Sequence, residues 1–297
     1  MASCFRFRAV VGVIAAMSVL GLGGCKDSGS GGAVRVVASF YPLAWAAEQV
    51  GGDAVTVEDL TPSGGEAHDL QLTARQRIAV QDADLVLMLG KGFQTEVERA
   101  ARDSGGRVVD LLEGLELLPA VEEELDADPH VWLDPVLMQR IVTRVGEELG
   151  RVDPDARADY TQRAINTEAG KLSPLGDSYQ RTIATCSLKT LVTTHEAFAY
   201  LAKRYALTQL GLTGLTPDAE PSAAQIQKVR DAARRNEVGA VFYEASDEGR
   251  RIGESVAGDV GVPALPLNTL ESDPAPNDYL SQMNQNLASL EQGLRCS

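Results

Sequence analysis

Short apolar runs alternate with amphipathic stretches along the first part of the chain. The apolar runs are rich in β-branched residues, which is typical of buried strands. They predict strands at Val34–Phe40, Val55–Leu60, Leu85–Leu89 and Val108–Asp110. The stretches between them carry a helical pattern, at Pro42–Val50, Leu72–Gln81 and Phe93–Ser104. Strands and helices in alternation predict a parallel sheet covered by helices.

The middle of the chain is helical, and the alternation resumes after it. Helices are predicted at Pro135–Leu149 and over a long amphipathic segment, Asp155–Ala184. Later strands are predicted at Thr190–Thr193, Gln209–Gly211, Ala240–Tyr243 and Ala264–Leu267, and later helices at Ala197–Tyr205, Ala223–Asn236, Arg250–Val260 and Tyr279–Arg295. We therefore predict an α/β fold of two lobes, each a mostly parallel sheet flanked by helices, joined by one long rigid helix. The expected boundaries are 34–150 for the N-terminal lobe, 151–184 for the connecting helix and 185–297 for the C-terminal lobe.

The first 24 residues have the pattern of a secretory signal peptide. Arg6 and Arg8 precede an apolar run, Ala9–Leu22, which is shorter than the roughly 20 residues that a membrane-spanning helix needs. The junction Leu22-Gly23-Gly24-Cys25 resembles the cleavage box of bacterial lipoproteins, in which the Cys is lipidated. Residues 25–33 would then be the lipidated Cys25 and a flexible tether. We expect an extracytoplasmic protein anchored to the cell membrane by a lipid on Cys25; the alternative is a simple secretory signal with a free Cys.

Charge and cysteine content narrow the classes of function. The formal net charge is −15, and without residues 1–24 it becomes 25 − 42 = −17. Such an acidic chain repels phosphate backbones, so no nucleic-acid partner is expected. Cys186 and Cys296 remain as an even pair for an oxidising compartment, which predicts a disulfide between them. Two separate buried thiols are the alternative.

The three histidines of the chain lie in loops next to predicted strands or in turns. His68 lies in a Gly-rich loop, His130 is bracketed by Pro129 and Pro135, and His195 follows the strand at Thr190–Thr193. Loops at the carboxyl ends of parallel strands converge, so three imidazoles from separate loops can form the first ligand shell of a transition metal. Taken alone this signal is weak, because a single loop histidine is usually a surface side chain.

The residues around these histidines resemble a known family. From about Val34 to Leu294 the chain is similar to the metal-binding receptor lipoproteins of bacterial ABC importers for zinc and manganese, solute-binding protein family 9. The motifs that carry the resemblance are Pro62–His68, Asp128–Pro135 (DPHVWLDP), Thr193–Tyr205 and Gly214–Ser222. All three histidines fall on the ligand positions of that family. The resemblance therefore implies that His68, His130 and His195 bind the metal.

The resemblance implies a carboxylate as the fourth ligand, in the loop after the last strand. The segment Leu267–Asp273 resembles the form found in zinc receptors, in which a Glu binds the metal, and this indicates Glu271. Asn268 in another register, Asp273 and water are the alternatives. Zinc receptors with a His-rich loop between the first two ligands differ from this chain, which has only the acidic Leu115–Asp126 there. Its Glu122-Glu123-Glu124 cluster is expected to be a solvated face rather than a cation-attracting patch.

Three imidazoles and one carboxylate favour Zn²⁺ as the ligand, with Mn²⁺ or Fe²⁺ as alternatives. The resemblance implies that manganese receptors carry a Glu where His195 stands. Because neutral imidazole binds the metal, we expect affinity to fall below about pH 6.5.

The function that the resemblance implies is capture of zinc between two lobes, with two ligands from each, and delivery to an ABC permease in the membrane that has a separate ATPase subunit. We expect a monomer that closes little on binding, with local movement of the loops around His68 or His195. An enzyme is not expected: the chain lacks H-E-x-x-H, G-x-S-x-G and P-loop motifs. A surface adhesin and, further off, a zinc hydrolase are the alternatives.

Overall fold

Eight strands form two parallel four-stranded sheets in the described part of the chain. The computed structural model describes residues 32–120, 125–215, 221–235, 237–244 and 246–297. The first sheet contains β1 (Val34–Ala38), β2 (Val55–Asp59), β3 (Leu85–Met88) and β4 (Arg107–Asp110). The second contains β5 (Thr190–Thr193), β6 (Thr208–Gly211), β7 (Val241–Tyr243) and β8 (Ala264–Pro266). The predicted signal peptide, Cys25 and the Glu122–Glu124 cluster lie outside the described residues.

Both sheets have the same strand order, although no sequence repeat relates them. The orders are β2-β1-β3-β4 and β6-β5-β7-β8. In each sheet the chain therefore adds its second strand on one side of its first strand and its third strand on the other. Ligands bind at such a reversal of strand order in open parallel sheets, outside the carboxyl ends of the strands. The predicted two-lobed α/β fold is confirmed.

Helices cover both faces of each sheet because neighbouring strand residues point to opposite sides. In the first sheet Val36 faces the side of α1, whereas Val37 faces the side of α2 and α3. In the second sheet Leu191 belongs to the same apolar cluster as Val36, whereas Val192 faces the side of α8 and α9. The helices are α1 (Tyr41–Gly51), α2 (Ala74–Asp82), α3 (Thr95–Ala101), α4 (Pro135–Val152), α5 (Arg157–Thr167), α6 (Ser173–Ala184), α7 (Ala199–Arg204), α8 (Ala223–Arg234), α9 (Asp247–Val260) and α10 (Tyr279–Gly293). Two 3₁₀ turns add Gly52–Ala54 and Val131–Leu133.

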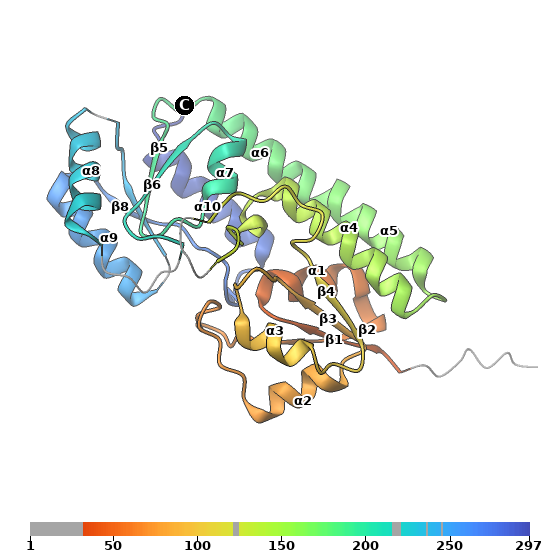
Figure 1. Cartoon of the computed structure of the whole chain (residues 1–297). Coiled ribbons are helices and arrows are strands. Elements are labelled where there is room, and N and C mark those ends of the chain that lie inside the picture. The colour runs from red at the N-terminus through yellow and green to blue at the C-terminus, as the bar shows by residue number, and fades with distance from the viewer. Residues whose placement is uncertain (1–31, 121–124, 216–220, 236, 245) are drawn as a thin grey trace, which may run out of the picture. The chain divides into compact units, whose positions relative to one another are not determined.

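The long helix predicted at Asp155–Ala184 runs from Arg157 to Ala184. It consists of α5 and α6 with a π-helical segment, Glu168–Leu172, between them. Along its length it contacts α1 and α4 through α5, and α10 through α6 (Figure 1). The helix therefore connects the two sheets and is held on both sides of the connection.

One apolar cluster contains residues from both sheets, so the two lobes share a core. Leu85 of β3, Phe242 of β7 and the fully buried Trp132 belong to it. Trp45 of α1 packs on Tyr279 of α10 with the ring centroids 4.7 Å apart. Ala33–Ser297 accordingly forms one compact unit.

A disulfide joins Cys186 to Cys296, as predicted. The backbone nearby continues this attachment, because Ser187 N and Leu188 N donate to the carbonyls of Arg295 and Leu294. The end of the chain is therefore fixed beside the start of β5. In the described part of the chain, the helices are all too short or too polar to cross a membrane.

Candidate metal centre

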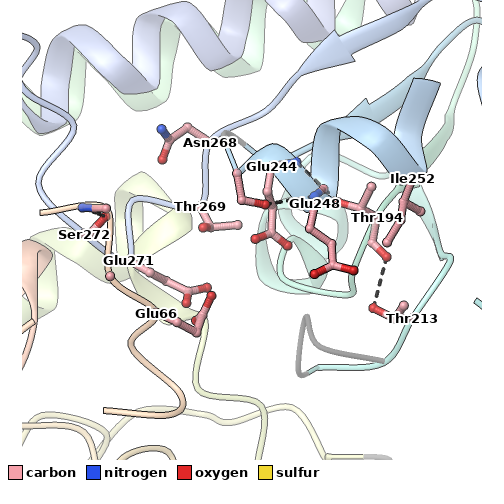
Figure 2. A pocket seen from close by; sticks show the side chains of 14 residues that line it. Glu66, Thr194, Thr213, Glu244, Glu248, Ile252, Asn268, Thr269, Glu271 and Ser272 are labelled. Atoms are coloured by element: carbon pink, nitrogen blue, oxygen red, sulfur yellow. Dashed lines mark hydrogen bonds between the residues drawn. The ribbon is translucent and has the colours of Figure 1, made fainter. Parts of the chain in front are cut away.

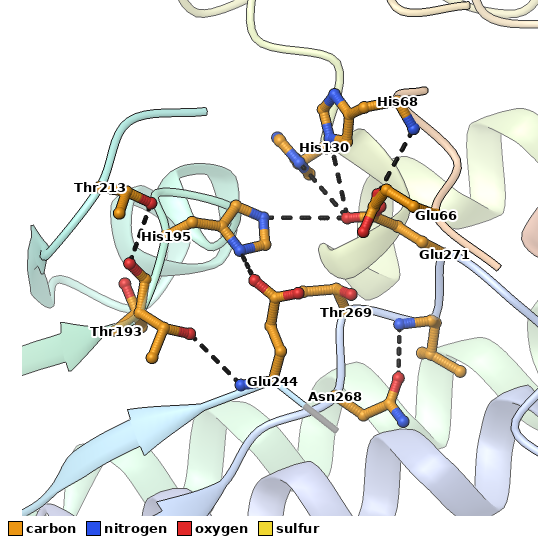
Figure 3. Close-up of polar contacts among 12 residues, drawn as sticks. Glu66, His68, His130, Thr193, His195, Thr213, Glu244, Asn268, Thr269 and Glu271 are labelled. Carbon is orange, nitrogen blue, oxygen red and sulfur yellow. Dashed lines mark hydrogen bonds and ion pairs between the residues drawn. The ribbon is translucent and has the colours of Figure 1, made fainter. Parts of the chain in front are cut away.

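Four side chains from separate loops meet at one point in the described structure. They are His68, His130, His195 and Glu271, and their donor atoms all lie within 4.8 Å of one another. The Nε2 atom of each imidazole lies 3.8 Å from Oε1 of Glu271 (Figure 3). Each of the four side chains is at most 5% exposed. The structure therefore brings together all four residues that the sequence indicated.

Parallel strand order explains why these loops meet. His68 lies in the loop after β2, His195 follows β5 directly, and Glu271 lies in the loop after β8. The carboxyl ends of the strands of one parallel sheet lie at the same edge, so the loops of each sheet gather there. His130 is placed differently, because it precedes the 3₁₀ turn Val131–Leu133 that leads into α4.

His130 is held by its own segment. Oδ1 of Asp128 accepts a hydrogen bond from the backbone N of His130 and contacts its Nδ1, at 2.9 and 2.8 Å. Pro135 starts α4 at a position where a missing N–H costs nothing, and Asp134 caps that helix by accepting from Val136 N. The rigid segment between these residues fixes where the imidazole lies.

The loop of His68 is fixed by buried polar contacts. Gln94 Nε2 donates to the carbonyl of Ala67 at 3.1 Å, and the ring of Phe93 packs edge-on against the His68 ring. The backbone N of His68 donates to Oε1 of Glu66 at 3.4 Å. His68 is thus held by an aromatic ring against its imidazole and by hydrogen bonds to the peptide unit that precedes it.

His195 is positioned by the second sheet. Gln209 Nε2 of β6 donates to the His195 carbonyl at 3.3 Å. On the side of the ring away from Glu271, Nδ1 contacts Oε1 of Glu244, which lies directly after β7. Glu244 was not singled out from the sequence.

The loop of Glu271 separates this residue from its two alternatives. Asn268 Oδ1 accepts a hydrogen bond from Leu270 N at 2.6 Å, which supports Leu270 in a left-handed conformation, φ 61°. Asp273 Oδ1 accepts from Ala275 N at 3.1 Å. Neither Asn268 nor Asp273 therefore offers its oxygen to the histidines, whereas Glu271 points into their midst (Figure 3).

The electrostatics of the centre favour neutral imidazoles. Burial lowers the pKa of His68 and of His195 well below 6.5, and the neighbouring imidazoles act in the same direction. Burial raises the pKa of the Glu271 carboxyl well above 4.5, and the nearby carboxylate of Glu66 raises it further. The lone pairs that a metal needs are thus available on His68 and His195 at neutral pH.

The donor atoms are buried without hydrogen-bond partners among the described residues. This holds for Nε2 of all three histidines and for both carboxylate oxygens of Glu271. Buried polar atoms in folded proteins are nearly always satisfied, because an orphaned one costs roughly 1–3 kcal/mol. Several such atoms aimed at one point indicate a bound cation.

The donor set fits zinc. Three imidazole nitrogens and a carboxylate oxygen suit tetrahedral Zn²⁺, whose bonds of about 2.0–2.1 Å place the ligand atoms roughly 3.4 Å apart. The observed separations, 3.8 Å from Glu271 Oε1 to each Nε2 and at most 4.8 Å overall, are slightly wider. Side-chain shifts of less than an ångström would close the shell.

A cavity of about 270 Å³ lies beside the centre. Figure 2 shows Glu271 and Glu66 close together in it, with Glu244 and Glu248 nearby. Glu66, like Glu244, was not singled out from the sequence, although it precedes His68 by two residues.

Comparison with known proteins identifies the family of the chain. The sequence profile described as zinc-uptake complex component A, periplasmic (ZnuA), matches residues 36–293. The chain belongs to the ZnuA family. A relative in this family is the high-affinity zinc uptake system protein ZnuA of Bacillus subtilis, which is 31% identical over 99% of this chain and 96% of its own length.

Other relatives of this ZnuA-family chain are larger or have known structures. The zinc-binding lipoprotein AdcA of Streptococcus pneumoniae is 30% identical over 94% of this chain, which spans only 60% of AdcA. The solved Zn(II)-bound ZnuA-like domain of that AdcA superimposes with a TM-score of 0.76 at 30% identity, covering 89% of this chain and 99% of the domain. The laminin-binding protein Lmb of Streptococcus agalactiae, described as an adhesin with metal-transporting activity, gives a TM-score of 0.80 at 30% identity, covering 88% of this chain and 99% of Lmb.

Proposed function

We propose that this chain is an extracytoplasmic receptor that captures Zn²⁺ between its two lobes and delivers it to an ABC-type permease. The ligands are His68 and His130 from the N-terminal lobe and His195 and Glu271 from the C-terminal lobe. The observation that carries the proposal is the set of buried donor atoms that have no hydrogen-bond partner among the described residues and face one point. Membership of the ZnuA family supports the same function.

Zinc is favoured over manganese and iron by the ligand types. Three of the four donors are imidazole nitrogens, which suit a borderline-soft ion, whereas Mn²⁺ prefers oxygen donors and higher coordination. The Zn(II)-bound state of the AdcA domain, which has a similar fold, agrees with this choice. Mn²⁺ or Fe²⁺ is the alternative cargo of the same site.

A receptor fits the site better than an enzyme does. Catalytic zinc keeps one coordination position open for water or substrate, and here Glu271 would fill the fourth position. Adhesion, which the description of Lmb reports for that protein, is the alternative function for this chain. It would not require His195 or the other donors, so it leaves their burial and convergence unexplained.

Delivery requires a membrane location and partners. We propose that residues 1–24 direct export and that a lipid on Cys25 anchors the mature protein to the outer face of the membrane. The loaded receptor, a monomer, would then meet a permease whose transport is powered by a separate ATPase subunit. The names of the relatives, a zinc uptake system protein and a zinc-binding lipoprotein, support this arrangement.

The decisive experiment measures metal content in the protein purified without residues 1–25. We expect one zinc per chain by mass spectrometry, and loss of the zinc in His195→Ala and in Glu271→Ala. Glu254→Gln is the matched control, because Glu254 is an exposed acid on α9 that pairs with Arg250 at 3.5 Å. Zinc retained in His195→Ala would contradict the proposed site, and a wild-type protein that binds no zinc under saturating conditions would favour adhesion.

A further inference from the structure

The outer ring nitrogens of two histidines are each in contact with a carboxylate. Nδ1 of His130 lies 2.8 Å from Oδ1 of Asp128, and Nδ1 of His195 contacts Oε1 of Glu244 (Figure 3). In both rings Nε2 faces Glu271. Asp128 comes from the same short segment as His130, whereas Glu244 lies 49 residues after His195.

The register of the second sheet brings Glu244 to His195. Strands β5 and β7 are parallel neighbours in which Thr193 is paired with Phe242. Two residues further along each strand, His195 stands opposite Glu244. The backbone beyond the strands is held together as well, because Thr194 N donates to the carbonyl of Phe242 and Glu244 N donates to Thr194 Oγ1 at 3.3 Å.

The proton on a neutral imidazole decides whether its inner nitrogen can bind a metal. A neutral ring carries one N–H, and only the other nitrogen has a free lone pair. Glu271 Oε1 lies 3.8 Å from Nε2 of His195, on the inner side of the ring. Without the contact from Glu244, nothing would hold the proton on Nδ1, and a proton on Nε2 blocks coordination.

We propose that Glu244 is a positioning residue for zinc capture, which keeps the proton of His195 on Nδ1 and turns Nε2 toward the metal. The inference rests on the proposed zinc site. A carboxylate behind a ligating histidine fixes both the tautomer and the orientation of the ring and makes the ring a stronger donor. Glu244 is itself only 8% exposed. Its charge also adds to the acidic surroundings of the site.

The first test needs no metal. The chain has only three histidines, so a sample labelled with ¹⁵N-histidine gives three imidazoles to resolve. In the metal-free protein we expect the His195 ring, assigned by comparison with a His195→Gln sample, to carry its proton on Nδ1. In Glu244→Leu the proton should move to Nε2, and in Glu244→Gln it should stay on Nδ1, because the amide oxygen still accepts. An unchanged tautomer in Glu244→Leu would overturn the proposal.

The second test measures zinc affinity by competition with a chelator. Loss of such a carboxylate typically costs 10–100-fold in affinity, which is the effect we expect for Glu244→Leu. Glu244→Gln keeps the hydrogen bond without the charge, so it should recover most of that loss. The control Glu254→Gln, at an exposed position on α9, should bind as the wild type does. A change of less than about threefold in Glu244→Leu would refute the positioning role.

The two tests distinguish failure of this inference from failure of the proposed function. If the wild-type protein binds no zinc, the proposed function fails, while the tautomer of His195 in the metal-free protein still reports on Glu244. If Glu244→Leu does not fold, Glu244→Ser, which withdraws the acceptor from Nδ1, supplies both the tautomer measurement and the affinity measurement. In that case equal affinity of Glu244→Ser and the wild type refutes the role.

Discussion

Zinc binding at pH 6 should release a proton from Glu271 and none from His68 or His195. Burial raises the pKa of the Glu271 carboxyl well above 4.5, so in the metal-free protein this group still holds a proton at mildly acidic pH. Burial lowers the pKa of His68 and of His195 well below 6.5, so these rings are already neutral. Zinc therefore displaces the carboxyl proton and none from these two rings.

The expected magnitude follows from counting protons. Each proton that the metal displaces makes the apparent affinity change tenfold per pH unit, which is about 1.4 kcal/mol. Between the lowered pKa of His68 and His195 and the raised pKa of Glu271, loss of the Glu271 proton should make the logarithm of the binding constant rise with pH with a slope of about one. The slope should steepen at lower pH, where His68 and His195 also become protonated. Imidazoles with the ordinary pKa would lower the zinc affinity below about pH 6.5. For His68 and His195 this contribution is expected only at a lower pH.

Calorimetric titration measures this proton count directly. Zinc held by a weak chelator is added at pH 6 in two buffers that differ in ionisation enthalpy, and the difference in heat gives the protons released. Glu271→Gln should release about one proton fewer than the wild type, whereas the control Glu254→Gln should release as many as the wild type. Imidazoles with the ordinary pKa of about 6.5 would each be about three-quarters protonated at pH 6. Release of one and a half protons or more in Glu271→Gln would therefore refute the reasoning.

The same shifts set the stability of the metal-free protein against pH. His68 and His195 have a lowered pKa in the folded state, so their contribution is present above about pH 6.5 and is lost as the pH falls through the folded pKa. Glu271 has a raised pKa, so its contribution is present below about pH 4.5 and is lost as the pH rises through the folded pKa. Zinc should consequently stabilise the protein most on the alkaline side, where the buried carboxylate is charged and needs a cation.

Three further outcomes are expected. Replacing both Cys186 and Cys296 by Ser removes a cross-link between residues 110 apart in sequence. Chain entropy predicts that the free energy of unfolding falls by at most about 5 kcal/mol. Calorimetry of the metal-free protein should show a melting temperature lower by roughly 10 °C, with the zinc affinity unchanged. Trp132→Phe removes the 2.7 Å hydrogen bond from Nε1 to the carbonyl of Thr269, at a cost of roughly 1–3 kcal/mol in stability. Zinc release, measured by stopped flow, should become faster. An unchanged rate would show that this bond does not hold the Glu271 loop. Solution scattering curves of the metal-free and zinc-loaded protein should nearly coincide, and a large rotation between lobes would contradict the shared core.

Most strands were predictable because they lie in short apolar runs, several of them rich in β-branched residues, as in β1. Their ends shifted by one or two residues, as at Val34–Phe40, where the strand stops at Ala38. The sequence did not reveal that the two sheets share one strand order. Strand order depends on the side to which each connection crosses and not on the type of residue. The π-helical segment Glu168–Leu172 was also missed. It changes the hydrogen bonds inside a helix while leaving the amphipathic pattern largely intact.

The ligands and their supporting residues differ in how far the sequence reveals them. His68, His130 and His195 could be singled out through long motifs that resemble a family, and the choice of Glu271 over Asn268 came from the same source. Glu244 was missed because its role depends on the register between β5 and β7. A signal was nonetheless present: His195 and Glu244 both follow predicted strands almost at once. Polar residues at matching places after neighbouring parallel strands meet, and this rule finds Glu244 as soon as the strand order is known.

The contacts between the lobes indicate how zinc can leave a site whose ligands are buried. A hinge motion would have to break the bond from Trp132 to Thr269, the bond from Tyr279 Oη to the Trp132 carbonyl and the apolar cluster that both sheets share. The hydrogen bond from Gly64 N to Ser272 Oγ, at 3.2 Å, ties the loop before His68 across the site. Opening this loop leaves both hydrogen bonds of Trp132 in place and uncovers His68. Release through this loop would free the metal from His68 while the shared core stays closed.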